Sequence, residues 1–442
     1  MTDIDTDRTA VVLLNRDLRV HDHPALAAAC SHADAVVPLF VLDDAILSRG
    51  FAAPNRLVFL AKALEDLRAL LRERGGDLVI RRGDIVTETM RMVRETSATA
   101  VVCSADVSAY ARRREQRLAA ACGTENVAFR TYPGVTVVPP GDIRPAGGDH
   151  YRVFTPYWRA WEAGSWRPIL AAPRQIRMPP GMTAGELPGR ELAGEGPVSP
   201  SLPAGGETEA RKLLAAAVRK RADWEPDHDD LAGDHTTRLS PYLHFGCVSA
   251  REVAERLRDH APGVVRQLAW RDFHHQVTAA FPDIARRDYR ARDQAWRDDP
   301  HAAEMWRRGQ TGVPVVDAGM RQLLAEGWMH NRARLITASF LTRNLKVHWR
   351  VGADHFFRWL CDGDIANNAG NWQWVAGTGN DTRPNRVLNP LRQARRFDPD
   401  GVYVRRHVPE LAEVQGAAVH TPWLLPENVR QALDYPPPLI DM

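Results

Sequence analysis

Short apolar runs alternate with longer amphipathic segments in the first third of the chain. The runs occupy residues 10–14, 35–42, 77–82 and 100–105, with a weaker one at 127–132. Between them, leucines at three- and four-residue spacing in 56–74 form the apolar stripe of a helix. Residues 24–33, 85–96 and 108–122 also favour helices. Continuous apolar strands that alternate with helices predict a doubly wound parallel sheet.

Polar side chains stand where the predicted strands end, which is where ligands bind in sheets of this kind. They are Asn15-Arg16-Asp17, Asp43-Asp44 and Asp106. No GxGxxG motif follows the first run, so we expect no dinucleotide pyrophosphate at this edge.

The pattern changes after residue 138. Prolines and glycines punctuate 139–205, which predicts a long surface connector, and the aromatic stretch 151–161 inside it predicts a short docked helix. From 206 onward the chain is predicted to be helical, with helices near 207–221, 249–260, 264–280, 315–326, 330–345 and 353–360. We therefore expect an α/β domain over 1–138, a linker over 139–205 and an all-α domain over 206–442.

Composition narrows the functional classes. The formal net charge is +3, so any nucleic-acid site must be a local basic patch. Five cysteines are scattered without a CxxC pair, which indicates a reducing compartment and no disulfide, iron–sulfur or metal site. An acidic, polar N-terminus and the lack of a long apolar run predict a cytoplasmic protein with no membrane partner.

The stretch 362–374, DGDIANNAGNWQW, is the most unusual in the chain. It combines two carboxylates, adjacent amides and two indoles, which together can hydrogen-bond the edge and stack on the face of a planar heteroaromatic ligand such as a flavin. A solvated turn before an amphipathic helix explains the same letters about equally well.

Three other constellations have a functional and an ordinary interpretation. The hydroxyls of 236–240 at a helix entrance suit phosphate oxygens, although a simple N-cap is commoner. Gln267 and Trp270 share a helix face that could read and stack a base, or could simply pack. Arg334, on one face with Asn331 and Leu335, could pair with Asp362 or Asp364.

Together these motifs resemble the photolyase/cryptochrome family, and within it the microbial class I photolyases for cyclobutane pyrimidine dimers, closest to the actinobacterial deazaflavin-antenna type. The resemblance spans nearly the whole chain. It rests on RDLRVHDHPAL (16–26), TTRLSPYLHFG (236–246), RQLAWRDFHHQ (266–276), VVDAGMRQL (315–323), GWMHNRARLITASFLTRNL (327–345), DGDIANNAGNWQW (362–374) and RVLNPLRQARRFDPDG (386–401).

The resemblance implies an N-terminal antenna domain, a linker and a helical domain that binds FAD and DNA. The working cofactor is implied to be reduced, anionic FAD. Motif matching assigns the flavin contacts to Thr236, Thr237, Leu239, Ser240, Arg271, Asn331, Arg334, Asp362, Asp364 and Asn368, the last of which would face flavin N5.

The implied activity is light-driven repair of UV-damaged DNA, in which excited reduced FAD passes an electron to a flipped-out dimer, the cyclobutane ring splits and the electron returns to the flavin. A poorly stacked, damaged pair costs less to flip than an intact one. The residues that match the dimer and phosphate contacts are Gln267, Trp270, Asn331, Arg332, Leu335, Trp374 and Arg386. Those that match the electron relay, from flavin to surface, are Trp372, Trp349 and Trp296.

The sequence departs from the family pattern at several positions. Many members carry Glu and Met where this chain has Gln267 and Leu335, so repair efficiency or lesion preference is open. Trp224 stands where a Tyr near the FAD phosphates is usual. Asp106 matches the deazaflavin-type members, which implies an 8-hydroxy-5-deazaflavin antenna, while a folate, a flavin mononucleotide or an empty pocket stays open.

Three alternatives remain. A (6-4) photolyase would carry His rather than Asn at position 331, and a different sequence after the DGD turn. A cryptochrome photoreceptor without repair activity stays open because of Gln267. A plain flavin oxidoreductase would need a substrate base and a nicotinamide motif, neither of which is present. The partner is expected to be damaged DNA, bound by a monomer.

Overall fold

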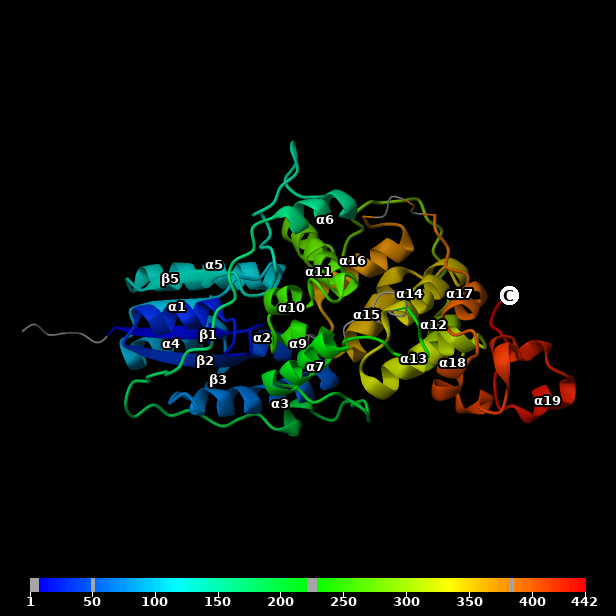
Figure 1. Cartoon of the computed structure of the whole chain (residues 1–442), viewed down its shortest axis with the longest axis horizontal. Helices are drawn as coiled ribbons and strands as arrows, with labels where there is room; N and C mark the ends of the chain where they lie inside the picture. The colour runs from blue at the N-terminus through cyan, green and yellow to red at the C-terminus, as the bar shows by residue number, and fades with distance from the viewer. Residues whose placement is uncertain (1–7, 49–51, 221–228, 381–382, 384) are drawn as a thin grey trace, which may run out of the picture. The chain divides into compact units, whose positions relative to one another are not determined.

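The computed structural model describes residues 8–48, 52–220, 229–380, 383 and 385–442, so that Trp224 lies outside the described residues. Contacts divide the chain into two compact units. Unit 1 consists of Met1–Gly196, Ala204–Arg221 and Thr237–Pro282, and unit 2 of Pro197–Pro203, Ala222–Thr236 and Asp283–Met442. Figure 1 follows the chain from the N-terminal sheet to the C-terminal helices.

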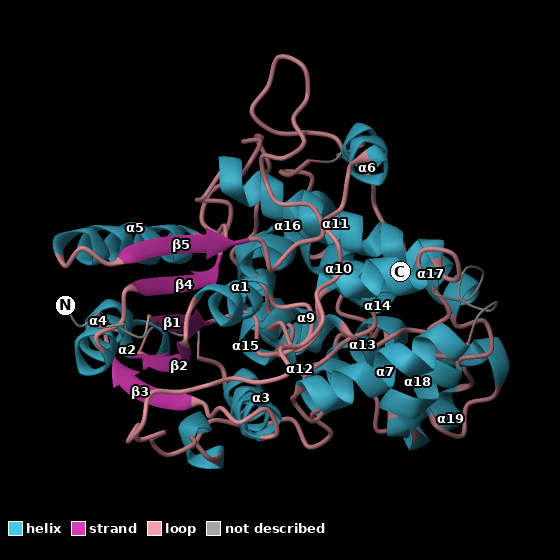
Figure 2. Cartoon of the chain, turned by 60° about the vertical axis from the view of Figure 1, so that its left-hand side comes forward, coloured by secondary structure: helices cyan, strands magenta, loops and turns pink. Residues whose placement is uncertain are grey.

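Unit 1 contains a five-stranded parallel sheet in the order β3-β2-β1-β4-β5, as Figure 2 shows. Each predicted run forms a strand. The three central strands β2, β1 and β4 are buried almost throughout, as suits runs without polar alternation, whereas the edge strand β5 is largely exposed. The strands are β1 (Thr9–Leu14), β2 (Ala35–Asp43), β3 (Val79–Gly83), β4 (Ala100–Ser104) and β5 (Ala128–Tyr132). The order, with crossovers on either side of β1, is that of a doubly wound sheet.

Helices cover both faces of the sheet. α4 (Ile85–Thr96) and α5 (Ala109–Thr124) pack over Val11 and Leu13 in one buried cluster, and α1 (Pro24–His32) contacts β1, β2, β4 and β5. Since alternate residues of a strand point to opposite faces, Val12 and Leu14 face away from that cluster. The helices α2 (Asp44–Leu47) and α3 (Pro54–Arg72) follow β2.

The connector runs along the sheet before it reaches the helical region. Its Ala184 carbonyl accepts the Ile80 amide of the edge strand β3 at 2.7 Å, which protects an otherwise open edge. It includes α6 (Phe154–Ala163) and a short 3-10 turn, Arg190–Ala193. The helices that complete unit 1 are α7 (Glu207–Arg219), α9 (Ser240–Phe245), α10 (Ala250–Leu257) and α11 (Pro262–Ala280).

A buried arginine joins the sheet to these later helices. The Arg19 guanidinium donates to the carbonyls of Gly246 at 2.9 Å, Gly134 at 3.0 Å and Asp22 at 2.9 Å. The Glu207 carboxylate accepts the Val20 amide at 2.6 Å. Segments far apart in the sequence thus share one polar network inside unit 1.

Unit 2 is helical. Its longer helices are α12 (Pro300–Arg308), α13 (Pro314–Glu326), α14 (Asn331–Ser339), α15 (Trp349–Trp359) and α16 (Ile365–Ala376). A π turn, Phe340–Asn344, interrupts the single helix predicted over 330–345. The C-terminal part contains α17 (Pro390–Phe397), α18 (Val402–His407), 3-10 turns at Pro409–Leu411, Gly416–His420 and Pro422–Leu424, and α19 (Glu427–Ala432).

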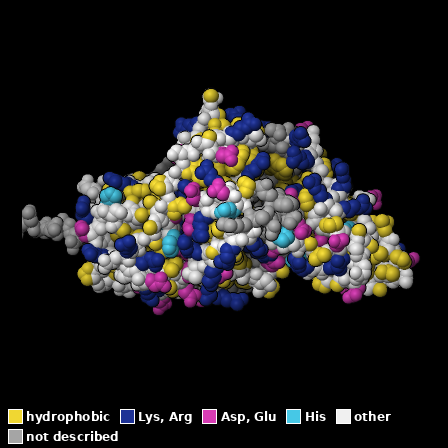
Figure 3. Space-filling view, in the orientation of Figure 1, with side chains coloured by type: hydrophobic (Ala, Val, Ile, Leu, Met, Phe, Trp, Pro, Cys, Tyr) yellow, Lys and Arg dark blue, Asp and Glu magenta, His cyan; other side chains and the backbone are white. Residues whose placement is uncertain are grey.

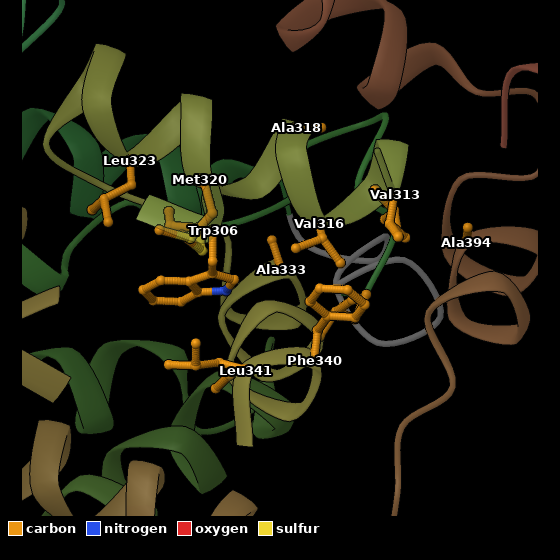
Figure 4. Close-up of a cluster of buried hydrophobic side chains, with 14 of the residues drawn as sticks. Trp306, Val313, Val316, Ala318, Met320, Leu323, Ala333, Phe340, Leu341 and Ala394 are labelled. Carbon is orange, nitrogen blue, oxygen red and sulfur yellow. The ribbon is translucent and has the colours of Figure 1, made fainter. Parts of the chain in front are cut away.

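The core of unit 2 is built around Trp306. Its indole is fully buried and donates to the Thr337 carbonyl at 3.0 Å. Figure 4 shows the indole among apolar side chains such as Met320, Leu323 and Leu341. This core holds α13 and α14 together and so fixes the helix that carries Asn331 and Arg334.

The predicted fold class is confirmed: a parallel α/β sheet precedes a helical region. The domain boundaries expected from the sequence stay a prediction. Among the described residues, no helix combines the length and apolarity that a membrane crossing needs.

Candidate functional site

The turn between α15 and α16 is held by a forked ion pair. Arg334, on α14, donates to both carboxylate oxygens of Asp362, at 3.1 and 2.8 Å. Its third nitrogen donates to the Met329 carbonyl at 2.8 Å. The Asp362 side chain is 4% exposed, so this pair is strongly shielded from water. Of the two partners expected for Arg334, the structure thus shows a bond to Asp362.

Asp364 starts α16. Its carboxylate accepts the Asn367 amide at 2.8 Å and the Asn367 side-chain amide at 2.7 Å, as an N-cap does. The helix then places Asn368, Asn371, Trp372 and Val375 along one face, at the i, i+3, i+4 and i+7 spacing expected of neighbours on a helix.

That face lines a cavity that is open to solvent. One side of the lining is polar, with amides, carboxylates and a guanidinium, and the other is apolar. The lining residues are Asn331, Arg334, Leu335, Ala338, Phe356, Leu360, Asp362, Gly363, Asp364, Asn367, Asn368, Asn371, Trp372 and Val375. The predicted residues of α14 and of the 362–374 stretch therefore converge.

Asn368 is held in place by the neighbouring helix. Its side-chain nitrogen donates to the Ala353 carbonyl of α15 at 3.0 Å. The Trp372 ring, 2% exposed, meets Phe356 edge-on at a centroid distance of 4.9 Å. An amide and an indole with restricted rotamers thus border the same cavity.

The hydroxyl-rich segment lies across the division of the chain. In unit 2, the Thr236 hydroxyl donates to Asp234 at 2.9 Å. In unit 1, the Thr237 hydroxyl accepts the Leu239 amide at 3.4 Å, Leu239 is buried, and Ser240 begins α9. A helix entrance was expected here and is present.

On α11, Trp270 is half-buried and Gln267, one turn earlier, is exposed. The Trp270 indole lies flat against the Phe154 ring, with centroids 3.6 Å apart and planes 8° apart. Arg271 points elsewhere and donates to the Val135 carbonyl at 2.8 Å and the Leu243 carbonyl at 3.4 Å.

The remaining predicted DNA contacts lie in unit 2. Arg332 forms an ion pair with Asp229, and its guanidinium stands 4.3 Å from the centre of the Phe397 ring. Arg386 is exposed and stands 5.1 Å from the centre of the Trp374 ring. Both cations thus lie beside aromatic rings.

The tryptophans expected to carry electrons differ in burial. Trp349 is fully buried and donates to Asp288 at 2.8 Å, and Trp296 is only partly buried. The His348 ring contacts both, with centroids 5.8 Å from Trp349 and 5.0 Å from Trp296. Sequence reasoning missed Trp306, whose ring centroid lies 6.0 Å from that of Trp372.

Asp106 follows β4, at the carboxyl edge of the sheet. Burial alone would raise the pKa of this carboxyl, but Arg16, His275 and Arg114 hold the pKa below its ordinary value. The Arg16 guanidinium lies 3.6 Å from Asp106. Close by along the edge, the Tyr110 hydroxyl donates to Asp43. The sequence analysis missed Tyr110 and Arg114, which the four-residue spacing along α5 would have placed on one face.

Residues 10–175 match the family model described as DNA photolyase, and residues 264–442 match the one described as the FAD binding domain of DNA photolyase. A deoxyribodipyrimidine photo-lyase of Streptomyces griseus is 54% identical over 440 residues, covering 98% of this chain and 96% of that protein. The chain belongs to the photolyase/cryptochrome family.

Other members of the photolyase/cryptochrome family are similar over the whole length. A cryptochrome DASH of Gloeobacter violaceus is 36% identical, with 98% of this chain and 93% of that protein covered. The crystal structure of a class III photolyase of Agrobacterium tumefaciens has a TM-score of 0.90 at 31% identity and covers 100% of this chain and 96% of that one. The expectation of an FAD-binding domain is confirmed by the family model.

Proposed function

We propose that this protein uses light to split cyclobutane pyrimidine dimers in DNA. The observation that carries the proposal is the convergence of Asn331, Arg334, Asp362 and Asn368 on one cavity. It is supported by the 54% identity, over nearly the whole chain, to a protein named deoxyribodipyrimidine photo-lyase.

The cavity fits a flavin in its chemistry. A flavin ring offers carbonyl and N–H groups along one edge and flat apolar faces, and the lining offers amides and carboxylates beside Phe356, Leu360 and Trp372. The forked pair of Arg334 and Asp362 neutralises the carboxylate while leaving the turn rigid. Bound FAD in its reduced, anionic form would supply the photoexcited electron donor.

Asp362 and Asp364 would accept hydrogen bonds from the ribityl chain and the ring edge. Asn368 would face flavin N5, because its side chain is fixed on the cavity side of α16 by the Ala353 carbonyl. A neutral amide there can pair with more than one protonation state of its partner without adding charge.

The flavin phosphates and a second contact to the ring are proposed for other segments. Thr236, Thr237, Leu239 and Ser240 provide hydroxyls and amides at the entrance of α9, which suit phosphate oxygens. Arg271, held by backbone carbonyls, would add a fixed positive charge.

A flipped-out dimer would lie against indoles. Trp270 and Trp374 are both half-buried, so each keeps ring surface for stacking. Gln267 is exposed, and Asn331 and Leu335 line the cavity, so they would contact the edges of the dimer. Arg332 and Arg386 would bind phosphates, which are the contacts that position DNA without reading sequence.

Electrons for reducing the cofactor would reach the cavity through Trp372, Trp349 and Trp296. Trp372 borders the cavity, Trp349 is buried and Trp296 is partly buried, which gives an inward order from surface to site. The His348 ring contacts both Trp296 and Trp349, so one aromatic side chain adjoins both members of this part of the proposed relay.

A second chromophore is proposed at the carboxyl edge of the sheet. The Asp106 carboxylate, 10% exposed and beside Arg16, suits a ligand with a hydroxyl or N–H edge, and an 8-hydroxy-5-deazaflavin has one. Reconstitution with a deazaflavin should add an absorption band to the wild-type spectrum and should fail to do so in Asp106→Ala.

The experiment that tests the main proposal is repair of a defined thymine dimer by FAD-loaded, reduced protein. Dimers should disappear under near-UV and blue light and persist in the dark. Trp270→Ala should bind the damaged DNA more weakly, by about 1–3 kcal/mol. Trp423→Ala, on the C-terminal turn Pro422–Leu424, is a matched control that should behave as wild type. An intact dimer after illumination of a photoreducible protein would overturn the proposal.

A cryptochrome function is the second candidate, because Gln267 stands where many repair enzymes carry a carboxylate. Gln267→Glu should raise the repair yield if the chain is a repair enzyme. A protein that photoreduces its flavin but repairs neither cyclobutane nor (6-4) lesions would be a photoreceptor. The five scattered cysteines, with no CxxC pair, support the proposal of a cytoplasmic setting, and a monomer is proposed with it.

A further inference from the structure

The connector helix α6 packs on α11 in unit 1, and three contacts fix it there. The first is the stack of Phe154 on Trp270, with a centroid distance of 3.6 Å. Phe154 is 5% exposed, so its ring is almost wholly enclosed. One face of the Trp270 indole is therefore covered by a side chain of the connector.

The second contact is a buried carboxylate. Asp272, two residues beyond Trp270, accepts the Trp161 indole N–H at 3.0 Å and the amides of Val137 and Val138 at 2.9 and 3.1 Å. Burial raises the pKa of Asp272 to about 6, against the lowering effect of Arg271. At pH 7.5 the group is thus an ionised acceptor for all three donors.

The third contact joins the segment just before α6 to the same helix. The Gln276 side chain accepts the Tyr151 amide at 2.9 Å and donates to the Tyr151 carbonyl at 2.8 Å. A side-chain amide bonded to both backbone groups of one residue fixes that residue in position and direction. Asp272 and Gln276 are one helical turn apart, so they clamp both ends of α6 along α11.

We propose that Phe154 is the positioning residue of Trp270: it stacks on one face of the indole and so holds the ring in one orientation, in which the opposite face can stack on a flipped-out base. The inference rests on the proposed function, in which Trp270 stacks on the dimer. The ligand that stacks on Trp270 is a flipped-out pyrimidine dimer. By packing on the indole, Phe154 lowers the rotamer freedom that Trp270 loses when the dimer binds.

The energetic reason is preorganisation. A half-buried tryptophan has several rotamers, and a ligand that needs one of them must bear the cost of selecting it. A ring locked by packing is held within the small tolerance that a binding site needs. Because the clamps at Asp272 and Gln276 fix α6, the Phe154 ring is itself a rigid support.

The first test measures binding of dimer-containing DNA by FAD-loaded protein at pH 7.5. Phe154→Leu should weaken binding about 2- to 10-fold, the range of an aromatic pair. Phe154→Tyr, which keeps the aromatic face, should bind the damaged DNA with wild-type affinity. Binding of undamaged DNA should be unchanged, since only the flipped-out base reaches the indole.

A double-mutant cycle shows whether Phe154 acts through Trp270. In a Trp270→Ala background, Phe154→Leu should have no further effect on dimer affinity, because the group it positions is gone. An equal effect in both backgrounds would overturn the inference. Phe40→Leu, at a similarly buried position of β2 (8% exposed), is the control for a general loss of packing and should leave dimer affinity unchanged.

A second readout needs neither DNA nor activity. Hydroxyl-radical labelling followed by mass spectrometry should show faster oxidation of Trp270 in Phe154→Leu than in wild type, with unchanged labelling in Phe40→Leu. Unchanged labelling of Trp270 would also overturn the inference. If Trp270→Ala itself leaves dimer affinity unchanged, the proposed function fails at this residue. If Trp270→Ala weakens binding and Phe154→Leu does not, only the positioning role fails.

Discussion

Arg334 and Asp362 are joined by two parallel hydrogen bonds, although Arg334 lies on α14 and Asp362 in the turn between α15 and α16. Asp362→Asn would leave the guanidinium beside a neutral amide in a shielded site. Because the Arg334 side chain keeps 24% of its exposure, we expect a loss of about 1–3 kcal/mol in unfolding free energy, less than for a fully buried pair. Retained FAD should fall as well.

Urea unfolding and the flavin absorbance of the purified protein measure both effects. The matched control is Asp44→Asn, whose partner Arg82 is largely exposed, as is Asp44 itself. Exposed pairs contribute about 0–1 kcal/mol, so this variant should be close to wild type. Equal losses in the two variants would show that the forked pair has no special role.

Three arginines of α17 should contribute to DNA binding. Arg392, Arg395 and Arg396 are exposed and, within the described residues, have no carboxylate partner. Figure 3 shows Lys and Arg side chains on the surface of this part of the molecule. Replacing all three by Gln should reduce the slope of log K against log salt by about 0.9 for each side chain that contacts a phosphate.

The control for this prediction replaces Arg91, Arg94 and Arg117, which are equally exposed but paired with Glu95, Glu125 and Asp84. Its salt slope should stay at the wild-type value. A slope unchanged in the α17 variant as well would place the DNA away from this helix.

Stability should fall as pH rises through about 6 because of Asp317. Burial raises the pKa of Asp317 to about 6, and hydrogen bonds from Tyr435 and Thr311 oppose the rise only in part. A carboxyl with a raised folded-state pKa binds its proton more tightly when folded. The protonated carboxyl therefore contributes on the order of 2–3 kcal/mol to the unfolding free energy below the unfolded pKa near 4. This contribution is lost between about pH 4 and 6.

Asp317→Asn has no such titration, so its stability profile should be flatter than that of the wild type in this range. Denaturant unfolding at half-unit steps from pH 4.5 to 7.5 measures the difference in slope, which is independent of the overall cost of the substitution. Parallel profiles would show that Asp317 titrates at its ordinary value.

Gly352 allows Trp372 to approach α15. A Cβ at this position would lie 2.1 Å from the indole Cη2 and 2.6 Å from a methyl carbon of Leu341. Gly352→Ala should therefore displace the indole and cost about 1–3 kcal/mol, as overpacked cores do. Gly123→Ala on α5, where a Cβ meets nothing within 4 Å, should be neutral or stabilising. Thermal unfolding and near-UV circular dichroism compare the two, and an unperturbed signal in Gly352→Ala would contradict the predicted displacement.

The sequence predicted most strongly where one local rule decides the structure. Apolar runs predicted β1 to β4, a weaker run predicted β5, and the leucine stripe predicted α3. It missed α12 (Pro300–Arg308), although Asp299 as N-cap, Pro300 after it and Gly309 at the end are capping signals that could have found the helix. The π turn at Phe340–Asn344 has no such signal.

In the candidate site, too, the sequence predicted the residues that local rules place and missed the pairs that depend on distant packing. Arg334, Asn331 and the 362–374 stretch could be placed on one cavity from helix periodicity and turn chemistry. Phe154 could not be matched with Trp270, since nothing local to either residue indicates which distant ring it meets. Trp306 beside Trp372 was missed for the same reason. Such pairs depend on packing of the whole chain, which periodicity does not describe.

The polar network of Arg19 limits how this protein can be rebuilt from parts. Its guanidinium and the adjoining Val20 amide are bonded to Gly246 and Glu207, which follow the connector in the sequence. A chimera that takes residues 1–138 from a relative would therefore exchange one side of a buried charged joint and leave the other. A graft that also carries the Glu207 side chain and the backbone around 246 keeps these donors and acceptors. The boundaries of an exchangeable module are therefore set by this hydrogen-bond network and not by the linker.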